Sequence, residues 1–328
     1  MQVPILKTLQ KIPGGLMIVP LLLGVLFNTF IPNALDIGGF TTHLFRGGAM
    51  PLIAFFVLCH GAQINLKQAG VPVYKGITYT LLKFAVGATI GWTVGQIWGS
   101  AGVLGLTPLA IVGAMTNSNG GLFVALTGKY GDSTDTGAIS ILSLTDGPFF
   151  TMLGLGLAGI ADIPVMQLVA VLVPIFIGFI LGNLDEEMRA FLKHGTVVPI
   201  PFFAFALGAG LNFQNIIDAG FSGVLLGFMT VIIIGSVGFF ASRLFGQFKA
   251  AGAAIGTTAG NAALTPAALV LADPTLAPFE ATATVQIATS VIITAIFCPL
   301  FVDFLDKRMK AKYGEDYIKP AEEEIVTT

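Results

Sequence analysis

Two short polar segments in opposite halves of the chain share one pattern, Thr-x-x-Asn-small-small-Leu. One begins at Thr116 and the other at Thr258, and each interrupts an apolar stretch long enough to cross a bilayer. Lipid cannot pair the backbone N–H and C=O groups that such a break exposes, so the break must line a cavity or be buried in protein. Matching breaks of this kind are typical of the binding site of a secondary transporter.

The chemistry that the two breaks favour is the binding of an anion. Each break leaves a helix N-terminus inside the membrane, with unpaired N–H groups and a partial positive charge. Asn119 and Asn261 stand where an N-cap is needed, and small residues follow them. Two such termini that face each other suit a carboxylate. We predict a substrate site, unless these side chains only satisfy the broken backbones; its residues are Thr116, Asn117, Ser118, Asn119, Thr257, Thr258 and Asn261.

A second cluster surrounds Asp146, the one acidic residue expected deep in the membrane. On a continuous helix over 136–160 it lies about ten residues past the preceding loop, near mid-depth at about 1.5 Å per residue. Ser140 and Ser143 share its face at spacings of three. Such a carboxylate suits the binding and release of a proton, or a cation, although a structural pair with Lys83 is the alternative. The predicted ion-coupling residues are Asp146, Ser140, Ser143, Thr145 and Gln286.

Three polar residues carry less specific predictions. Gln286, on an expected helix over 280–305, takes part either in ion coupling or in an interhelical hydrogen bond. His60 is expected to be a hydrogen-bonded packing residue, and Lys83 to extend its ammonium group toward the membrane surface. The sequence has no phosphate-binding loop, nucleophile motif or metal-binding spacing of His, Cys and carboxylates, so neither an enzyme nor a bound cofactor is expected.

The composition predicts an all-α integral membrane protein. Hydrophobic residues make up 55% of the 328 residues and charged residues only 10%, against about 25% charged residues in soluble proteins. The mean hydropathy of +0.87 agrees. The net charge of −2 gives no reason to expect a nucleic-acid partner. The first apolar stretch lacks the features of a cleaved leader, and Cys59 and Cys298 are expected to be buried free thiols.

The apolar stretches predict ten transmembrane helices, because a span needs about 20 apolar residues. With the N-terminus in the cytoplasm, all but Arg46 and Lys83 of the 16 Lys and Arg residues lie on the cytoplasmic side. Both termini are therefore expected there. The expected spans are 14–31, 49–65, 74–98, 104–127, 136–160, 165–183, 196–213, 219–243, 250–272 and 280–305.

The second five spans repeat the first five. Pro20-x-x-x-Gly24 matches Pro174-x-x-x-Gly178, and the run from Phe55-Phe56 to Gly61 and Asn65 matches the run from Phe202-Phe203 to Gly208 and Asn212. Because five is odd, the two copies must have opposite orientations. We predict a 5+5 inverted repeat with crossing broken helices in spans 4 and 9, divided into repeats over 1–160 and 161–312 and a cytoplasmic tail over 313–328.

Several segments resemble the bacterial 2-keto-3-deoxygluconate permeases. They are Ile12–Met17, Asn119–Leu122, Asp146–Met152, Gly178–Asp185 and Ile200–Gly208, which reads Ile-Pro-Phe-Phe-Ala-Phe-Ala-Leu-Gly. The resemblance implies an inner-membrane symporter that imports this sugar-acid monocarboxylate together with protons. More distantly, the 5+5 plan is similar to that of the bile-acid:sodium symporters. That likeness implies a sodium site at Ser118, Asn119, Ser140 and Asp146, but a glycine, Gly256, stands where the wider group has a sodium-ligating glutamate.

We expect the ten spans to form two parts with the substrate between them. Spans 3–5 and 8–10 form a core that holds the crossing, spans 1, 2, 6 and 7 form a panel, and the sugar acid binds between them. Within transport, the alternative is a sodium-coupled symporter of another organic anion; from a different class, it is an anion channel. The expected partners are the sugar acid and the lipid bilayer, and the sequence carries no prediction about oligomeric state.

Overall fold

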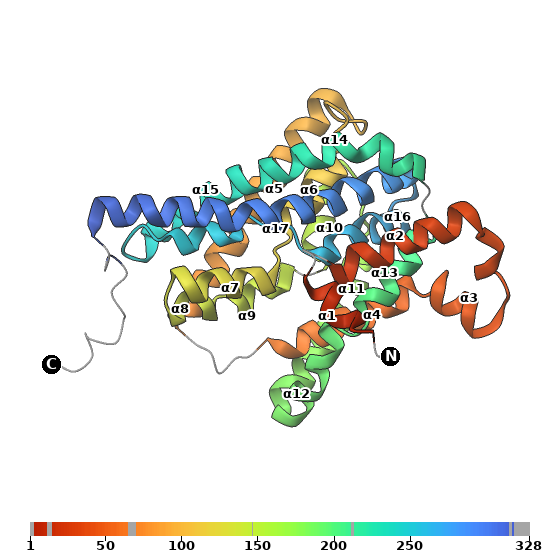
Figure 1. Ribbon diagram of the computed structural model, residues 1–328, viewed down its shortest axis with the longest axis horizontal. Coiled ribbons are helices and arrows are strands. Elements are labelled where there is room, and N and C mark those ends of the chain that lie inside the picture. The colour runs from red at the N-terminus through yellow and green to blue at the C-terminus, as the bar shows by residue number, and fades with distance from the viewer. Residues whose placement is uncertain are drawn as a thin grey trace.

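The computed structural model describes residues 3–11, 15–64, 70–145, 147–210, 213–314 and 317. The regular structure of this described part is helical (Figure 1), with one isolated β-bridge between Val103 and Leu106. The α-helices are α1 (Ile5–Lys11), α2 (Gly15–Phe30), α3 (Gly39–Phe45), α4 (Ala49–Gln63), α5 (Val71–Trp98), α6 (Pro108–Thr116), α7 (Gly120–Tyr130), α8 (Ser133–Gly137), α9 (Ile139–Leu142), α10 (Phe149–Leu157), α11 (Val165–Leu184), α12 (Glu186–Lys193), α13 (Ile200–Gly208), α14 (Phe213–Met229), α15 (Gly235–Ala241), α16 (Thr265–Ala272) and α17 (Ala277–Tyr313).

Shorter elements connect or interrupt these helices. A π-helical turn, η4 (Thr230–Ile234), joins α14 to α15. Three of the 3₁₀ helices bear on the site: η2 (Ser143–Thr145), η6 (Ala250–Ile255) and η7 (Gly260–Leu264). The last two make the first part of the expected span over 250–272 3₁₀-helical rather than α-helical, and the stretch Ala250–Ala272 is long and apolar enough to cross a bilayer. The 3₁₀ form is narrower than an α-helix, and the run Ala250-Ala251-Gly252-Ala253-Ala254 is buried throughout.

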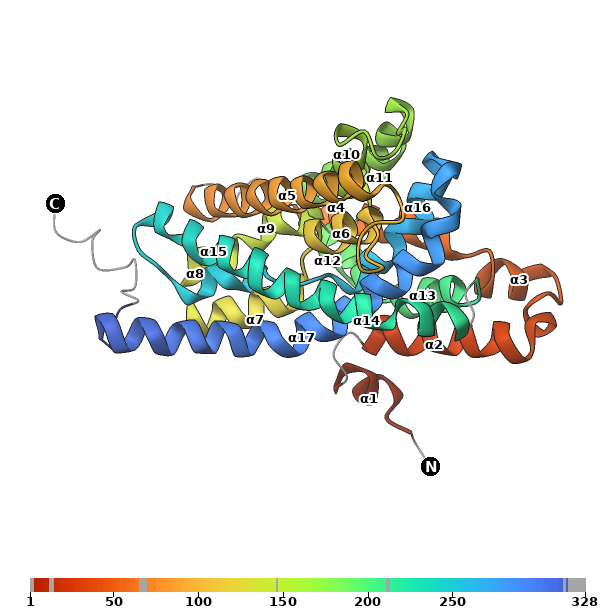
Figure 2. The same ribbon diagram turned by 90° about the horizontal axis from the view of Figure 1, so that it is seen from above.

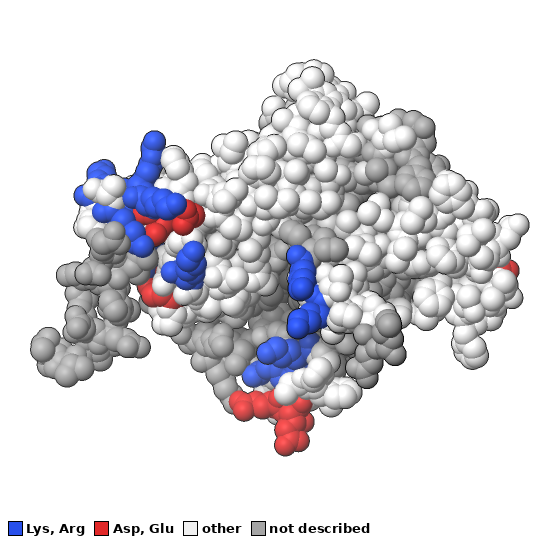
Figure 3. Space-filling model, in the orientation of Figure 1, with Lys and Arg blue, Asp and Glu red and all other residues white. Residues whose placement is uncertain are grey.

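The helices are those of a membrane protein. In the described part of the chain, five helical stretches are long and apolar enough to cross a bilayer, or seven if each of two bent helix pairs is one span. Two shorter apolar helices cover Ile18–Phe30 and Leu168–Leu184. Each of the ten expected stretches contains helix, but the number of ten spans stays a prediction. On the face in Figure 3, charged side chains gather at the left and at the lower edge, and a column of Lys and Arg runs from the lower edge to the middle of the face. Much of the other described surface in this view is uncharged.

The long helices form two groups. The core group, α5–α10 with α14–α17, fills the left and upper part of Figure 1, and the panel group, α2, α4, α11 and α13, lies toward the lower right. Seen from above, α5, α14, α15 and α17 run along one direction (Figure 2). Within the core group α14 packs along α17 and α5 along α6 and α9; within the panel group α2 packs on α13 and α4 on α11.

The panel helices approach each other through glycines. A Cβ atom at Gly24 would overlap the Phe205 carbonyl, and one at Gly208 would overlap the Leu21 carbonyl, so α2 and α13 are in backbone contact. Gly61 and Gly178 bring α4 and α11 together in the same way. The sequence repeat matches Gly24 with Gly178 and Gly61 with Gly208. The two contacts are therefore reciprocal, as two copies related by a two-fold axis would make them.

The expected continuous helix over 136–160 is interrupted. α9 ends at Leu142, η2 covers the next three residues, and α10 begins only at Phe149. Pro148 explains the break, because proline has no N–H for the helical ladder and its ring clashes with the preceding turn, and it also disfavours the α conformation of Gly147. The prediction of one continuous helix was wrong for this segment. Asp146 lies outside the described residues, so the face that it was expected to share with Ser140 and Ser143 stays a prediction.

Candidate functional site

The first break has the predicted cap. α6 ends at Thr116, α7 begins at Gly120, and the two helices are bent by 46°. Asn119 is the N-cap of α7, and its side-chain oxygen accepts the N–H of Leu122 at 3.0 Å. It thereby satisfies one of the unpaired donors at the start of the helix.

The second break differs from the prediction in its cap. η7 begins at Gly260 with Ala259 as its N-cap, and no side chain accepts a hydrogen bond there. Asn261 is the second residue of η7, so its assignment as an N-cap was wrong. The reason is the tight 3₁₀ turn: the N–H of Ala262 donates to the Ala259 carbonyl at 3.1 Å, which starts the turn ahead of the asparagine.

The two breaks are in contact. The backbone N–H of Asn119 donates to the hydroxyl of Thr257 at 3.1 Å. The hydroxyl of Thr258 donates to the Ala114 carbonyl of α6 at 3.3 Å. Segments 138 and 144 residues apart in the chain thus meet at one place in the core group.

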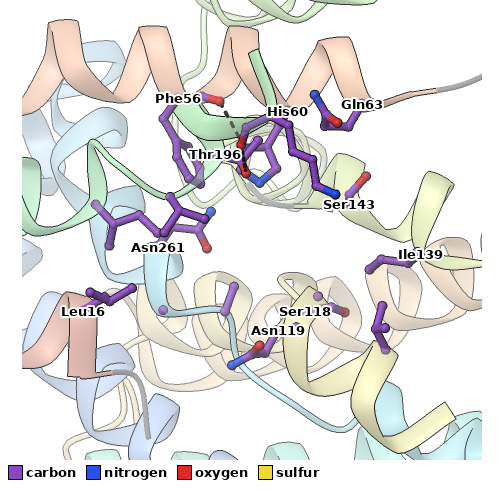
Figure 4. Close-up of a pocket in the computed structure, with 18 of the residues that line it drawn as sticks. Leu16, Phe56, His60, Gln63, Ser118, Asn119, Ile139, Ser143, Thr196 and Asn261 are labelled. Carbon is purple, nitrogen blue, oxygen red and sulfur yellow. Dashed lines mark hydrogen bonds between the residues drawn. The ribbon is translucent and has the colours of Figure 1, made fainter. Parts of the chain in front are cut away.

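A cavity of about 950 Å³ lies beside this meeting point. Three of the predicted substrate residues and two of the predicted coupling residues line it. Figure 4 shows Ser118 and Asn119 on one side, with Phe56, His60 and Gln63 of α4 across from them and Asn261 beside the space. The predicted residues that the structure brings together here are Ser118, Asn119, Asn261, Ser140 and Ser143.

Four other predicted substrate residues lie behind the cavity wall, fully buried and hydrogen-bonded. The hydroxyl of Thr116 lies 3.1 Å from that of Thr151, and the Asn117 amide donates to the same hydroxyl at 3.2 Å. Thr257 accepts from Asn119, and Thr258 lies 2.8 Å from the Ser290 hydroxyl. These four side chains therefore have hydrogen-bond partners within the protein, and their predicted role in substrate binding stays a prediction.

Two predicted coupling residues are also engaged away from the cavity. The hydroxyl of Thr145 donates to the Leu142 carbonyl at 2.7 Å and accepts the backbone N–H of Ser118 at 3.3 Å. Gln286 of α17 accepts from the Thr107 hydroxyl at 3.2 Å and donates to the Ser222 hydroxyl at 2.9 Å. Gln286 therefore ties α17 to α14 and to the start of α6, as in its hydrogen-bonding alternative.

The sequence prediction missed the wall that faces the breaks. Phe56, His60 and Gln63 lie one turn apart on α4, and Lys193 and Thr196 line the cavity from the end of α12 onward. Two polar side chains three residues apart in an apolar helix were a usable signal for His60 and Gln63. For Lys193 the sequence holds no such signal, because its place depends on how α12 packs against α4.

The electrostatic character of the cavity suits an anion. Among the described lining residues Lys193 carries the one formal charge, and none is Asp or Glu. Gly120 and Gly121, also in the lining, belong to the first turn of α7, whose N–H groups have no partner within the helix. A Cβ at Gly121 would have only the Asn119 side-chain oxygen nearby, at 3.7 Å, so a ligand can approach this backbone closely.

Three buried polar atoms near the breaks have no hydrogen-bond partner within the described structure. They are the Ser118 hydroxyl, the Asn117 amide oxygen and the Asn261 amide nitrogen. An unpaired buried polar atom costs about 1–3 kcal/mol, so each is a place where a ligand atom would be stabilising. Ser118 and Asn261 reach the cavity. The described part of the chain holds no group of three His, Cys, Asp or Glu residues suited to a metal ion.

The prediction that Lys83 extends its ammonium group toward the membrane surface was wrong. Its side chain is completely buried, and the ammonium donates to the carbonyls of Ile255 at 2.7 Å and Thr257 at 2.6 Å. Lys83 turns inward because the unwound backbone after η6 offers carbonyls without helical partners. These carbonyls lie within reach of the middle of α5.

A buried ionic cluster joins the two halves of the core group at another place. Lys75 of α5 binds Asp135 of α8, and Lys249 binds Asp132 and, at 3.3 Å, Asp135. Burial raises the pKa of Asp132, but hydrogen bonds from Lys249 and Thr134 outweigh it and hold that pKa well below its usual range. For Lys249, burial lowers the pKa, and the bond to Asp132 with the attraction of Asp135 raises it by more. Both groups stay charged at neutral pH, which makes them poor carriers of a proton.

The helical fold and the long apolar helices are those of a multi-pass membrane protein, and its cavity lies beside two breaks that are in contact. The sequence comparisons specify it further. The profile of the 2-keto-3-deoxygluconate permease family matches residues 6–311, and the chain belongs to that family. It is therefore a transporter rather than an enzyme.

Several relatives match over nearly their whole length. The 2-keto-3-deoxygluconate permease 1 of Salmonella typhimurium is 52% identical over 302 residues, which cover 92% of this chain and 95% of the relative. The 2-keto-3-deoxygluconate permease of Bacillus subtilis is 40% identical over 312 residues, covering 93% and 94%. That of Escherichia coli O139:H28 is 37% identical over 312 residues, covering 93% and 95%.

Proposed function

We propose that this protein is a secondary active symporter of the bacterial cytoplasmic membrane that imports 2-keto-3-deoxygluconate together with protons. The observation that carries the proposal is the cavity of about 950 Å³ at the two breaks, with donors and a cationic side chain in its lining and no described acidic residue. The names of the relatives supply the substrate, a sugar acid with one carboxylate and several hydroxyls.

The lining offers partners for both parts of the substrate. The carboxylate binds at the N–H groups of Gly120 and Gly121 and at the Asn261 amide, where positive charge and unpaired donors coincide. Hydroxyl groups bind to the Ser118 hydroxyl and, across the cavity, to Gln63. Lys193 attracts the anion to this site electrostatically.

Alternating access follows from the two groups of helices. In our proposal the chain forms ten spans in a 5+5 inverted repeat, and the reciprocal glycine contacts of the panel group support that symmetry. The core group rocks against the panel group around the substrate, which lies between them. The glycine contacts favour a panel that moves as one body, because close-packed interfaces deform little.

The orientation in the membrane is a separate proposal with its own test. We propose that both termini are cytoplasmic, because nearly all Lys and Arg residues then lie on that side. A reporter enzyme active only in the periplasm should give no signal when fused after Lys312 and a strong signal when fused near Asp273. The reverse pattern would contradict this orientation.

Uptake into proteoliposomes tests the proposed function. Labelled 2-keto-3-deoxygluconate should accumulate above its external concentration when the outside is acidic, and a protonophore should abolish the accumulation. A sodium gradient at equal pH should produce none. Accumulation driven by sodium alone would instead favour a cation site at Ser118 and Asn117, whose buried oxygen atoms have no partner in the described structure. Equilibration without accumulation under either gradient would contradict symport and favour the channel alternative.

A further inference from the structure

Lys83 holds the unwound part of the second break. Its ammonium donates to two carbonyls of one segment, Ile255 at 2.7 Å and Thr257 at 2.6 Å, and its side chain is fully buried. That segment lies between η6 and η7, where carbonyls lack helical partners. An ammonium group away from water is costly unless dipoles or charges surround it. The two carbonyls and the ammonium therefore stabilise each other.

The same contact reaches the cavity through one residue. Thr257 binds Lys83 with its carbonyl, and its hydroxyl accepts the backbone N–H of Asn119 at 3.1 Å. Asn119 caps α7 and lines the cavity. A short chain of hydrogen bonds thus leads from the middle of α5 to the N-terminus of α7, which the proposed function assigns to the carboxylate.

The second half of the chain has no counterpart of this lysine. The matched motifs place the two halves 142 to 154 residues apart, so residue 83 corresponds to the stretch from 225 (83 + 142) to 237 (83 + 154). That stretch reads Leu-Leu-Gly-Phe-Met-Thr-Val-Ile-Ile-Ile-Gly-Ser-Val and holds no Lys or Arg. The two halves differ at this point: the first half supplies a lysine to the second break, and the corresponding stretch of the second half supplies none.

We propose that Lys83 is a built-in cation of the crossing and acts as a positioning residue for anion binding. It fixes the backbone of Thr257, which in turn orients Asn119 and the start of α7. The inference rests on the proposed function for the identity of the anion.

A double-mutant cycle between Lys83→Gln and Thr257→Val tests this role in the purified full-length protein. Lys83→Gln should raise the dissociation constant for labelled 2-keto-3-deoxygluconate about tenfold or more, as expected for a bond to a charged group. Lys83→Arg, which keeps the charge, should recover part of the affinity. The double variant should bind no more weakly than the weaker single variant, because the two variants break successive links of one chain of hydrogen bonds that leads to Asn119. Wild-type affinity in Lys83→Gln, or additive losses, would overturn the proposal.

Lys75→Gln is the matched control, since Lys75 is another buried lysine of α5 but belongs to the ionic cluster. It should lower the melting temperature and leave the affinity of the folded protein unchanged. If the two lysine variants change both quantities alike, Lys83 is merely structural.

Should Lys83→Gln not fold, the cycle is run with Lys83→Arg, and additivity again overturns the proposal. If wild-type protein binds no 2-keto-3-deoxygluconate, the proposed function fails, and the cycle of melting temperatures still decides whether Lys83 and Thr257 are coupled.

Discussion

Alanine in place of Asn119 or Asn261 is expected to raise the dissociation constant for 2-keto-3-deoxygluconate about tenfold or more, while the protein still folds and inserts. Asn119→Ala removes the cap of α7, which is worth about 0.5–2 kcal/mol, and with it the fixed start of the helix. Asn261→Ala removes an amide nitrogen that is buried beside the cavity and has no described protein partner. Equilibrium binding of labelled substrate to purified protein measures both effects.

Asn183→Ala is the matched control for these two variants. Its amide also lies in an apolar helix and donates to two carbonyls, of Ile64 at 2.8 Å and Phe179 at 2.9 Å, but it does not line the cavity. It should lose stability without losing affinity. Wild-type affinity in both Asn119→Ala and Asn261→Ala would contradict the proposal that the substrate carboxylate binds at the N-terminus of α7.

Asp146→Asn is expected to abolish accumulation of substrate against its gradient. The expectation comes from the sequence, which places this acid between the serine pair of the cavity wall, Ser140 and Ser143, and the break at Pro148. In the proposed cycle the carboxylate takes up a proton outside and releases it inside, and proton and substrate raise each other's affinity by the same factor. Asparagine imitates the protonated form but cannot release a proton. Exchange of labelled for unlabelled substrate should therefore persist, whereas uptake driven by a pH gradient should vanish.

The control for this variant is Asp36→Asn. Asp36 pairs with Arg46 at 2.6 Å, and both side chains are well exposed, so the pair contributes little to stability. Both exchange and driven uptake should stay at the wild-type level. The decisive contrary result is driven accumulation by Asp146→Asn at the wild-type rate. That outcome would show that Asp146 has a structural role and that another residue of the site carries the proton.

Local signals in the sequence were sufficient to locate the two breaks. Polar and glycine residues within an apolar stretch mark a point where a lipid-exposed helix is interrupted. At the first of these points Asn119 caps α7, as predicted. Gly147-Pro148 carried an equally local signal for the break after α9, since such pairs punctuate helices. That signal was outweighed by the length of the apolar stretch around it, which led to the wrong prediction of one helix.

Contacts between distant segments could not be predicted in this way. Lys83 meets a carbonyl 172 residues away, and His60 and Gln63 face Asn119 only because the panel group lies across from the breaks. No spacing in the sequence fixes such an approach, because it depends on the packing of whole helices. The same holds for the separation of Ser118, which reaches the cavity, from its neighbour Asn117, which lies behind the wall.

The reciprocal pairing of the panel group has a consequence for biosynthesis. α2 packs against α13, and α4 packs against α11. Each pair therefore contains one helix from each half of the chain. A ribosome adds about 5–20 residues per second, which leaves α2 in the membrane for on the order of ten seconds or longer before α13 exists. During that time the close-packing surfaces around Gly24 and Gly61 have no protein partner. The first half is thus a nascent intermediate that must wait in the bilayer for its second half, rather than a unit that folds as it emerges.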